Sequence, residues 1–593
     1  CRVYAPVGGH RDLLAYLVRR LLENGANTSF VSVAADTTVS LAQVLLPPQD
    51  EIRRPENARN RRIAMPADLY APARRNSAGI EFGDRASLDA LVRDTRAAWR
   101  VLDAMPLLDG IAVAGRPRAV LSPIDGAAIG TVSEGDAAIA ASAMIAAQAG
   151  FADWQATPVA ARAACLDRAG DLLERKYATF IGLLQAEGGK TLDDAVSELR
   201  EAVDYCRYYA AQARTTLTPQ PMPGPTGESN ELRYRGRGVF VCISPWNFPL
   251  AIFLGQVTAA LVAGNAVVAK PAEQTPLIAH EAVRLLHEAG IPFAALHVVP
   301  GDGTVGAALV ADRRCAGVAF TGSTEVGQTI NRALAAKNGP IVPLIAETGG
   351  INAMIVDATA LPEQVADDVV LSGFRSAGQR CSALRLLCLQ EEIADHVLEM
   401  VAGAARELAL GDPRDIATHV GPVIDAEAKE RLDRWIDTMQ SQGRVHFRWD
   451  AGRALPERGF FVPPAIVRLD RAADLKEEVF GPVLHVVRWR VDALEDLLEE
   501  IAANGTALTL GIHSRIDARA AGIAARLSNG NVYVNRSMIG AVVGTQPFGG
   551  AGTSGTGPKA GGPNYLRRLA SEQTFTVNTT AAGGNASLFA AED

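Results

Sequence analysis

The chain has few of the features that mark secreted, metal-binding or nucleic-acid-binding proteins. Its seven cysteines are scattered over 593 residues, their number is odd and none forms a CxxC pair. This pattern excludes a disulfide framework and a zinc site, and it indicates a reducing compartment. The net charge is −8 and aromatic residues make up only 6%, so no overall basic field or base-stacking platform favours nucleic acid. No basic segment followed by an apolar one opens the chain, and we expect no signal peptide.

One long uncharged run raises the question of a membrane span. Residues 239–269 carry no charge, and the run is longer than the roughly 20 residues that a spanning helix needs. It contains Pro245, Asn247, Pro249 and Asn265, which suit a lipid-facing helix poorly. We therefore predict a buried strand, loop, helix and strand, without membrane contact.

Helical segments alternate with short apolar runs from about residue 115 onward. The predicted helices cover 137–150, 158–186, 191–214, 275–289, 361–378, 392–410, 425–443, 491–503 and 517–528. The predicted strands include 239–244, 266–270, 297–300, 317–321, 354–356, 383–389, 483–488, 508–513 and 531–534. Alternation of this kind is typical of parallel, doubly wound sheets. The fold class is therefore α/β, with two doubly wound domains in tandem.

The first part of the chain is different. Residues 1–40 predict a short strand and a helix over 11–24 that ends at Gly25, a unit too small to bury its own apolar stripe. Residues 47–80 are polar and interrupted by proline, which is typical of a linker. A chain that begins at Cys1 with such a unit looks like a fragment of a longer one.

Three motifs place reactive side chains next to predicted strands. Cys381 in GQRCS lies between a helix and a strand, where backbone amides would stabilise a thiolate; the alternative is a small buried hydrophobic residue. Glu347 in ETGG ends a strand, where ligands meet open α/β sheets, although a surface acid beside a turn would look the same. Asn247 in PWNFP is either an amide donor in an apolar setting or a helix cap.

Two further motifs suit a nucleotide. Lys270 and Glu273 in AKPAE follow a strand and can hold a ribose diol from both sides. The segment FTGSTEVG, residues 320–327, is a glycine turn before a helix, whose first amides suit a phosphate. It is not GxGxxG, so by itself it is a weak signal.

These motifs, together with EEVFGP at 477–482, occur in one order on one chain, each at a strand end. The set resembles the aldehyde dehydrogenase superfamily over roughly residues 115–575, with Thr348 where leucine is common. The resemblance implies a NAD-binding domain over 115–345 with a hairpin near 215–237, and a catalytic domain over 346–545. It leaves 41–114 as a linker or arm, and 546–593 as an anchor loop with a C-terminal strand and tail that form a small β flap for oligomerisation.

The resemblance also implies a role for each matching residue. Cys381 would attack the aldehyde, the Asn247 side chain and the Cys381 amide would hold the oxyanion, and Glu347 would activate water against the thioester. Glu273 would repel a 2′-phosphate, which favours NAD over NADP. The implied NAD ligands are Ser244, Trp246, Lys270, Glu273, Gly322, Ser323, Glu478 and Phe480.

A glycine pair near the C-terminus bears on the substrate. Gly561 and Gly562 expose backbone amides that, with the Ser382 hydroxyl, can grip a carboxylate; the alternative is a flexible loop. The arrangement resembles the anchor loop of L-glutamate γ-semialdehyde (pyrroline-5-carboxylate) dehydrogenases, and Phe248 would cover the aliphatic part of that substrate. Dehydrogenases of other carboxylated semialdehydes such as succinic semialdehyde, acylating enzymes that use coenzyme A, and a non-catalytic NAD-binding module are the alternatives.

Residues 1–40 are similar to the last strand and helix of the proline dehydrogenase barrel, which precedes the aldehyde dehydrogenase in the bifunctional proline utilization A family. Tyr4, Arg19 and Arg20 match proline-binding residues and Glu23 a residue near the flavin; alternatively, the arginines offset a helix dipole. FAD is expected only in the missing part of the barrel. The resemblance further implies the second step of proline catabolism in the bacterial cytoplasm, and a homodimer formed through the hairpin and C-terminal tail.

Overall fold

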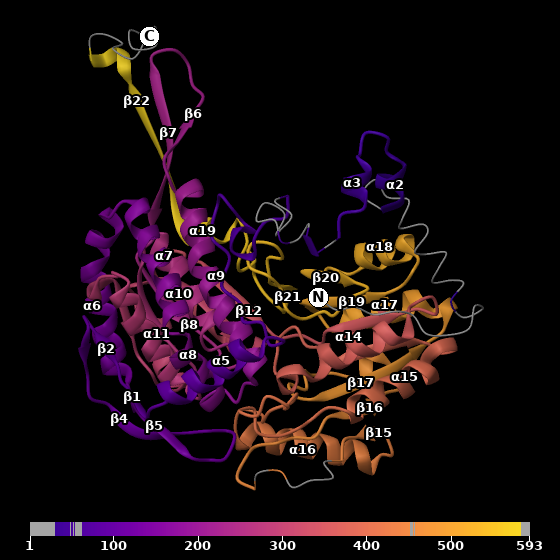
Figure 1. Ribbon diagram of the computed structural model, residues 1–593. Coiled ribbons are helices and arrows are strands. Elements are labelled where there is room, and N and C mark those ends of the chain that lie inside the picture. The colour runs from indigo at the N-terminus through magenta and orange to yellow at the C-terminus, as the bar shows by residue number, and fades with distance from the viewer. Residues whose placement is uncertain are drawn as a thin grey trace. The chain divides into compact units, whose positions relative to one another are not determined.

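The computed structural model describes residues 30–47, 49–50, 53, 62–450, 455 and 457–582, together with Leu13 (Figure 1). The chain divides into two compact units, Cys1–Leu69 and Tyr70–Asp593. The first contains α2 (Phe30–Ala35), α3 (Leu41–Val44) and the 3-10 helix η2 (Pro66–Asp68). Four residues matched to the proline dehydrogenase barrel lie outside the described residues: Tyr4, Arg19, Arg20 and Glu23.

The second unit begins with elements that the sequence predicted as linker. Helix α5 (Arg85–Ala98) is capped by Asp84, whose carboxylate accepts hydrogen bonds from two amides of the first turn. Strands β1 (Leu102–Ala104), β5 (Ala128–Glu134) and β4 (Arg116–Leu121) form a three-stranded sheet in that order. Ordered structure of this unit therefore begins well before residue 115.

The first large sheet has seven strands in the order β12-β11-β8-β9-β10-β2-β3. The first five strands in this order, from β12 to β10, run parallel to one another. Strands β2 and β3, at the other edge of the sheet, are paired antiparallel. Its strands are β2 (Leu107–Leu108), β3 (Ile111–Ala112), β8 (Val239–Ile243), β9 (Ala266–Lys270), β10 (Leu296–Val298), β11 (Cys315–Gly322) and β12 (Leu344–Thr348). The helices of this lobe are α6 (Ala137–Ala156), α7 (Val159–Arg175), α8 (Tyr177–Ala186), α9 (Leu192–Thr216), α10 (Ala251–Val262), α11 (Pro276–Glu288), α12 (Gly303–Ala311) and α13 (Thr324–Ala335).

The second large sheet also has seven strands, in the order β15-β16-β17-β14-β13-β19-β20, and only the β15–β16 pair is antiparallel. Its strands are β13 (Ala353–Val356), β14 (Leu386–Gln390), β15 (Val445–Arg448), β16 (Ala465–Arg468), β17 (Val483–Trp489), β19 (Thr509–His513) and β20 (Asn531–Val534). Its helices are α14 (Pro362–Phe374), α15 (Glu391–Arg406), α16 (Ala426–Ser441), α17 (Leu494–Ala503) and α18 (Asp517–Arg526). The expected α/β fold with two parallel sheets is confirmed.

Strand side chains of the first sheet alternate between two buried clusters. Val239 and Val241 of β8 belong to one cluster, and Phe240 and Cys242 belong to the other. This is the pattern of a strand buried on both faces, which explains the continuous apolar sequence. The uncharged run 239–269 is the predicted strand, loop, helix and strand, and none of the described helices is long and apolar enough to cross a bilayer.

A long antiparallel flap leaves the body of this unit. It consists of β6 (Gln220–Met222), β7 (Glu228–Gly236) and β22 (Ala570–Asn578) in the order β22-β7-β6. Figure 1 shows these strands projecting away from the two sheets. The C-terminal strand therefore pairs with a hairpin more than 330 residues earlier in the chain, with Ala570 opposite Gly236.

Two predicted helices end earlier than their periodicity indicates. The predicted helix 158–186 is interrupted at Lys176, whose φ of −99° and ψ of 20° separate α7 from α8. The predicted helix 361–378 ends at Phe374, because Ser376 and Ala377 adopt left-handed backbone conformations with φ of 56° and 53°. Neither glycine nor proline marks the break at Lys176, whereas Gly373 lies directly before the end of α14 and Gly378 belongs to the turn that follows, so only the second break had a local signal.

Candidate active site

A pocket open to solvent brings together residues from both sheets. Its polar lining includes Cys381, Glu347, Ser382, Glu201 and Arg380. Aromatic side chains form much of the remaining wall, namely Tyr205, Phe248, Phe320, Phe548 and Tyr565. The predicted nucleophile and the predicted acid thus face one cavity, as do Ser382 and Phe248.

The segment before the nucleophile is a left-handed turn. Ser376, Ala377 and Gly378 all have φ between 53° and 66°, a region that residues with a Cβ rarely occupy. At Gly378 a Cβ would lie 2.1 Å from the carbonyl oxygen of Gly481, so only glycine fits there. The turn ends the helix and directs the chain into the position of Cys381.

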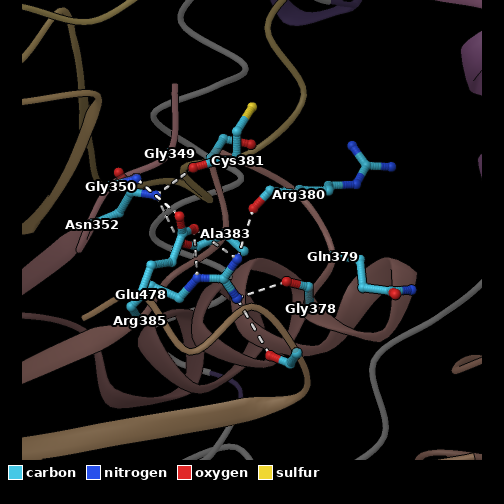
Figure 2. A network of polar contacts seen from close by, with 12 residues as sticks. Gly349, Gly350, Asn352, Gly378, Gln379, Arg380, Cys381, Ala383, Arg385 and Glu478 are labelled. Atoms are coloured by element: carbon cyan, nitrogen blue, oxygen red, sulfur yellow. Dashed lines mark hydrogen bonds and ion pairs between the residues drawn. The ribbon is translucent and has the colours of Figure 1, made fainter. Parts of the chain in front are cut away.

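Arg385 holds the end of this turn, and Figure 2 shows its guanidinium directed at the carbonyl groups around it. Its guanidinium donates to the carbonyl oxygens of Gly378 at 2.6 Å, Arg380 at 3.0 Å and Gly481 at 3.3 Å. It also forms an ion pair with Glu478 at 3.1 Å, and its side chain is completely buried. A buried arginine that satisfies several carbonyl groups is a rigid support, because moving any of them would leave charged donors unpaired.

The main chain after the nucleophile has a second support. Asn352 donates its side-chain amide to the carbonyl oxygens of Cys381 at 2.6 Å and Ala383 at 2.9 Å, as Figure 2 also shows. Sequence reasoning missed both Arg385 and Asn352. The available signal for Arg385 was a charged residue immediately before the apolar strand β14.

Glu347 lies near the end of β12; the residue is half-buried, but both of its carboxylate oxygens are buried. Among the described residues no group donates a hydrogen bond of normal geometry to either carboxylate oxygen. Burial raises the pKa of Glu347 to about 8, and the nearby Gly550 amide and Lys559 ammonium offset this only in part. Such a carboxyl group can take a proton near neutral pH, which suits a general base.

The Cys381 thiol is half-exposed to the pocket. Its surroundings raise its pKa to about 12, first through desolvation and then through the carboxylates of Glu478, Glu347 and Glu201. The thiol is therefore protonated at neutral pH in the absence of a ligand. It needs a proton acceptor or a bound cation to become a thiolate.

Asn247 lies beside the nucleophile segment, in the loop that follows β8. Its side-chain amide donates to the carbonyl oxygen of Gln379 at 3.1 Å, and it lines a second, smaller pocket together with Trp246 and Gln379. An amide nitrogen has two hydrogens, so one remains for a substrate oxygen. Trp246 packs edge-to-face on Phe480, with the ring centroids 5.6 Å apart.

The residues matched to NAD ligands gather at the carboxyl ends of adjacent strands. Lys270 ends β9 and is buried, and its ammonium donates to the Pro271 carbonyl oxygen at 2.9 Å. Burial lowers the pKa of Lys270 to about 8. The Ser244 amide donates to the Lys270 carbonyl and joins the ends of β8 and β9, while Ser323 caps α13 just after β11. Gly322 is the last residue of β11, and Glu273 is exposed.

Glu478 is turned inward in this structure. One carboxylate oxygen accepts from Arg385, and the other accepts from the Gly350 amide at 3.2 Å. Each oxygen therefore already has a donor, and the main effect of Glu478 here is to support the segment around Cys381. Its expected bond to the nicotinamide ribose stays a prediction.

The predicted anchor glycines are placed differently from expectation. The Gly561 amide donates to the Tyr209 hydroxyl at 2.9 Å, and the Gly561 carbonyl accepts from the Gly544 amide at 3.0 Å. Gly561 and Gly562 are both buried and neither lines the pocket. The prediction that the Gly561 amide binds a substrate carboxylate is therefore wrong, because that hydrogen is already used inside the protein.

A different pair of backbone amides faces the pocket beside Ser382. Gly540 and Ala541 line the cavity, and neither amide donates a hydrogen bond to any described residue. Gly540 has φ of 78°, and no atom lies within 4 Å of the place its Cβ would occupy. The signal in the sequence was a glycine soon after strand β20, within SMIGAVVG.

Comparison with known proteins agrees with this site. The model of the aldehyde dehydrogenase family matches residues 112–575, and that of proline dehydrogenase matches residues 1–33. The bifunctional protein PutA of Klebsiella aerogenes is 49% identical over 589 residues, which are 97% of this chain and 44% of that protein. The chain thus spans about half the length of this relative.

Smaller relatives match the chain over most of their own length. The 1-pyrroline-5-carboxylate dehydrogenase of a Geobacillus species is 39% identical over 446 residues, which are 74% of this chain and 85% of that protein. A crystal structure of the 1-pyrroline-5-carboxylate dehydrogenase from Thermus with bound NAD is 32% identical, with a TM-score of 0.80, and covers 85% of this chain and 99% of that one. With a family model that matches most of its length, this chain belongs to the aldehyde dehydrogenase family.

Proposed function

We propose that this chain oxidises L-glutamate γ-semialdehyde, the open form of pyrroline-5-carboxylate, to L-glutamate with NAD. The observation that carries the proposal is the composition of one pocket. It joins Cys381 and Glu347 to Ser382 and to the unpaired amides of Gly540 and Ala541. A nucleophile and a base thus share a cavity with three hydrogen-bond donors that suit an anion. We call these donors, the Ser382 hydroxyl and the amides of Gly540 and Ala541, the anion-binding corner.

The substrate has an α-carboxylate, an α-ammonium group and a short aliphatic chain. Two backbone amides and the Ser382 hydroxyl suit the carboxylate. Glu201 lines the same pocket, and burial with the nearby Glu198 carboxylate raises the pKa of Glu201 to about 7. A bound ammonium group would favour the ionised form of Glu201. Phe248 lies against the remaining wall and suits the methylene groups.

The chemistry assigned to this chain uses three side chains. The Cys381 thiol loses its proton to solvent and the sulfur attacks the aldehyde carbon, while the free amide hydrogen of Asn247 and the Cys381 backbone amide stabilise the oxyanion. Loss of hydride from that carbon leaves a thioester on Cys381. Glu347 then accepts a proton from water as the water oxygen attacks the thioester carbonyl; the C–S bond breaks, glutamate leaves, and the proton on Glu347 returns to the sulfur and restores the thiol.

The residues at the strand ends fit NAD. The Lys270 ammonium uses one of its three hydrogens on the Pro271 carbonyl, which leaves two for ribose hydroxyls. Ser323 lies at the N-terminus of α13, which suits a pyrophosphate, and Glu273 favours a ribose that carries no 2′-phosphate. When bound, NAD supplies the hydride acceptor. The relative from Thermus holds NAD, which supports this assignment, and FAD would belong to the proline dehydrogenase part of a longer protein.

The flap supports a proposal about assembly. Met222, Phe575 and Val577 on its strands are 46%, 43% and 41% exposed. Apolar side chains on a projecting antiparallel sheet are typical of an interface. We propose a homodimer in which each flap is covered by a second copy of the chain. By analogy with its bifunctional relatives, the whole protein would act in proline catabolism in the bacterial cytoplasm.

Production of NADH by the purified chain tests the substrate. We expect turnover with L-glutamate γ-semialdehyde and a much lower kcat/KM with succinic semialdehyde, which has no ammonium group for Glu201. A higher kcat/KM with succinic semialdehyde would contradict the proposed substrate but would still agree with the oxidation of an aldehyde. No NADH from any aldehyde would favour a non-catalytic NAD-binding module.

A further inference from the structure

A buried carboxylate on α9 contacts the segment that precedes the nucleophile. Asp194 is in the first turn of α9, and its side chain is completely buried. One of its oxygens accepts from Arg375 at 2.6 Å and from Arg380 at 2.8 Å. The other accepts from the Ser376 hydroxyl at 2.7 Å. All three donors lie within six residues of Cys381.

These bonds enclose the left-handed turn. Arg375 and Ser376 lie at its beginning and Arg380 follows it, so one carboxylate holds both ends. Arg380 also donates to the Ser376 hydroxyl oxygen at 2.9 Å, which closes a ring of bonds around the turn. Left-handed conformations at Ser376 and Ala377 are unfavourable and persist only where the surroundings enforce them. Asp194 supplies that enforcement through the side chains of Arg375, Ser376 and Arg380, whereas Arg385 binds main-chain carbonyl groups.

The contact also joins the two lobes. Neighbouring residues of α9, such as Ala195, belong to the core of the first sheet, whereas Ala377 of the turn belongs to the core of the second. Asn247 and the NAD-binding candidates from Ser244 to Ser323 belong to the first lobe, whereas Cys381 follows the turn of the second. The position of Asp194 therefore sets the position of the sulfur relative to the groups that act on the same aldehyde.

Asp194 carries a negative charge at neutral pH. Burial alone would raise its pKa, but Arg380 and Arg375 hold the pKa of Asp194 well below its usual range. The anion is thus a permanent partner for the two arginines rather than a titrating group. A neutral residue in its place would leave the buried Arg380 guanidinium without its counter-ion and Arg375 with Asp193 alone.

We propose that Asp194 is a positioning residue: it holds the turn at 376–378 so that the Cys381 sulfur and amide face the aldehyde carbon and Asn247. This inference deepens the proposed function and rests on Cys381 as the nucleophile. Nothing in the reaction requires Asp194 to touch the substrate. Its effect is expected in kcat more than in KM.

The first test compares two adjacent aspartates. Asp194→Asn keeps the shape of the side chain but removes its charge. The new amide NH2 group would face at least one of the groups that now donate a hydrogen bond to Asp194. Asp193→Asn is the matched control, because Asp193 is 58% exposed and contacts only Arg375. We expect Asp194→Asn to lower kcat by about tenfold or more, since small misplacements of reacting groups cost up to roughly a hundredfold. KM for the aldehyde and Kd for NAD should change less than about threefold, and the control should keep its kcat within about twofold.

A second-site variant separates positioning from general stability. Glycine adopts positive φ without steric cost, so Ala377→Gly should keep the turn when its carboxylate support is lost. In the double variant Asp194→Asn/Ala377→Gly, kcat should recover at least about threefold over Asp194→Asn. Ala377→Gly alone gives the reference for this comparison. A purely structural role would lower melting temperature and active fraction without recovery of kcat by the glycine.

Two outcomes would overturn the proposal: an unchanged kcat in Asp194→Asn, or a loss of kcat that Ala377→Gly does not restore. If Asp194→Asn does not fold, Ser376→Ala decides, because it removes one bond to Asp194 and leaves both ion pairs. It should lower kcat by about two- to fivefold with little change in KM, and an unchanged kcat would overturn the proposal. Cys381→Ala tests the proposed function separately, because full activity there would refute the nucleophile whatever Asp194 does.

Discussion

The carboxylate of Glu347 lies directly against the backbone of Gly549. A Cβ at position 549 would be 2.6 Å from Oε1 of Glu347, and one at Gly555 would be 3.3 Å from Oε2. The acid is therefore enclosed by glycines of the segment that follows the second sheet. Its orientation toward the pocket depends on their lack of side chains.

Gly549→Ala should displace Glu347. Because a contact of 2.6 Å cannot persist, we expect the steady-state rate to fall by about tenfold or more, as for a misplaced general base. The first turnover of NADH should be less affected, since thioester formation does not use this base. Rapid mixing measures both phases. Gly522→Ala is the control, because no atom lies within 4 Å of the position of its Cβ; equal losses in the two variants would contradict this account.

Thioester hydrolysis should follow the protonation of Glu347. The pKa of Glu347 is raised to about 8, so the group is mostly protonated below pH 8 and cannot accept a proton from water there. The hydrolysis rate should increase about tenfold per pH unit well below this pKa and level off above it. In Glu347→Gln the rate should be low and independent of this ionisation. A wild-type profile that is flat between pH 6 and pH 9 would refute Glu347 as the base.

Cys381→Ala should abolish aldehyde oxidation and leave NAD binding intact. The thiol is the only sulfur that the described part of the pocket contains, and the residues matched to NAD lie at other strand ends. Isothermal titration gives the Kd for NAD, and absorbance gives the formation of NADH. Substantial residual turnover in this variant would eliminate the assigned nucleophile.

Ser382→Ala tests the anion-binding corner. Losing one hydrogen bond to a carboxylate costs about 1.5–3 kcal/mol, or roughly 10- to 150-fold in kcat/KM. This loss is expected for L-glutamate γ-semialdehyde, whereas propanal has no carboxylate and should lose less than about threefold. Gly562→Val should not discriminate between the two substrates, because Gly562 lies outside the pocket. A selective loss in Gly562→Val instead of Ser382→Ala would restore the original prediction for the glycine pair.

Phe575→Asp tests the flap. Phe575 is 43% exposed on β22 and stacks under Arg233, whose guanidinium lies 3.8 Å from the ring centroid. A charge placed in a covered apolar interface should weaken the dimer, because its removal from water is costly and the neighbouring Arg233 already pairs with Glu231. Light scattering should then report a lower mass than for the wild-type chain. A monomeric wild-type chain would contradict the proposed homodimer.

The catalytic and NAD-binding candidates could be predicted from the sequence, because they follow regular strands. Strand periodicity placed Glu347 and Lys270 at strand ends, and parallel strands bring such ends to one edge of a sheet. The left-handed turn could not be predicted from the sequence. Ser376 and Ala377 adopt it only because Asp194 and Arg385 hold the surrounding segment through hydrogen bonds and ion pairs. Asp194 itself lies about 180 residues from its partners in the chain, so no local pattern indicates the contact.

The anion-binding corner shows a different limit of prediction from the sequence. Gly561 and Gly540 both have positive φ. Only the three-dimensional path of the chain decides that the Gly561 amide meets Tyr209 whereas the Gly540 amide meets the pocket. A glycine motif can thus predict free backbone amides, but it does not indicate which ligand or side chain they face.

The covalent intermediate on Cys381 is the most direct test of the central claim. Glu347→Gln should be mixed with L-glutamate γ-semialdehyde and NAD, quenched in acid to keep the substrate amine protonated, and digested for mass spectrometry. We predict that the peptide containing Cys381 carries a glutamyl group, in an amount that matches the NADH released in the first turnover. Formation of NADH without this adduct, or an adduct on a different residue, would contradict the assignment of Cys381 and of the reaction.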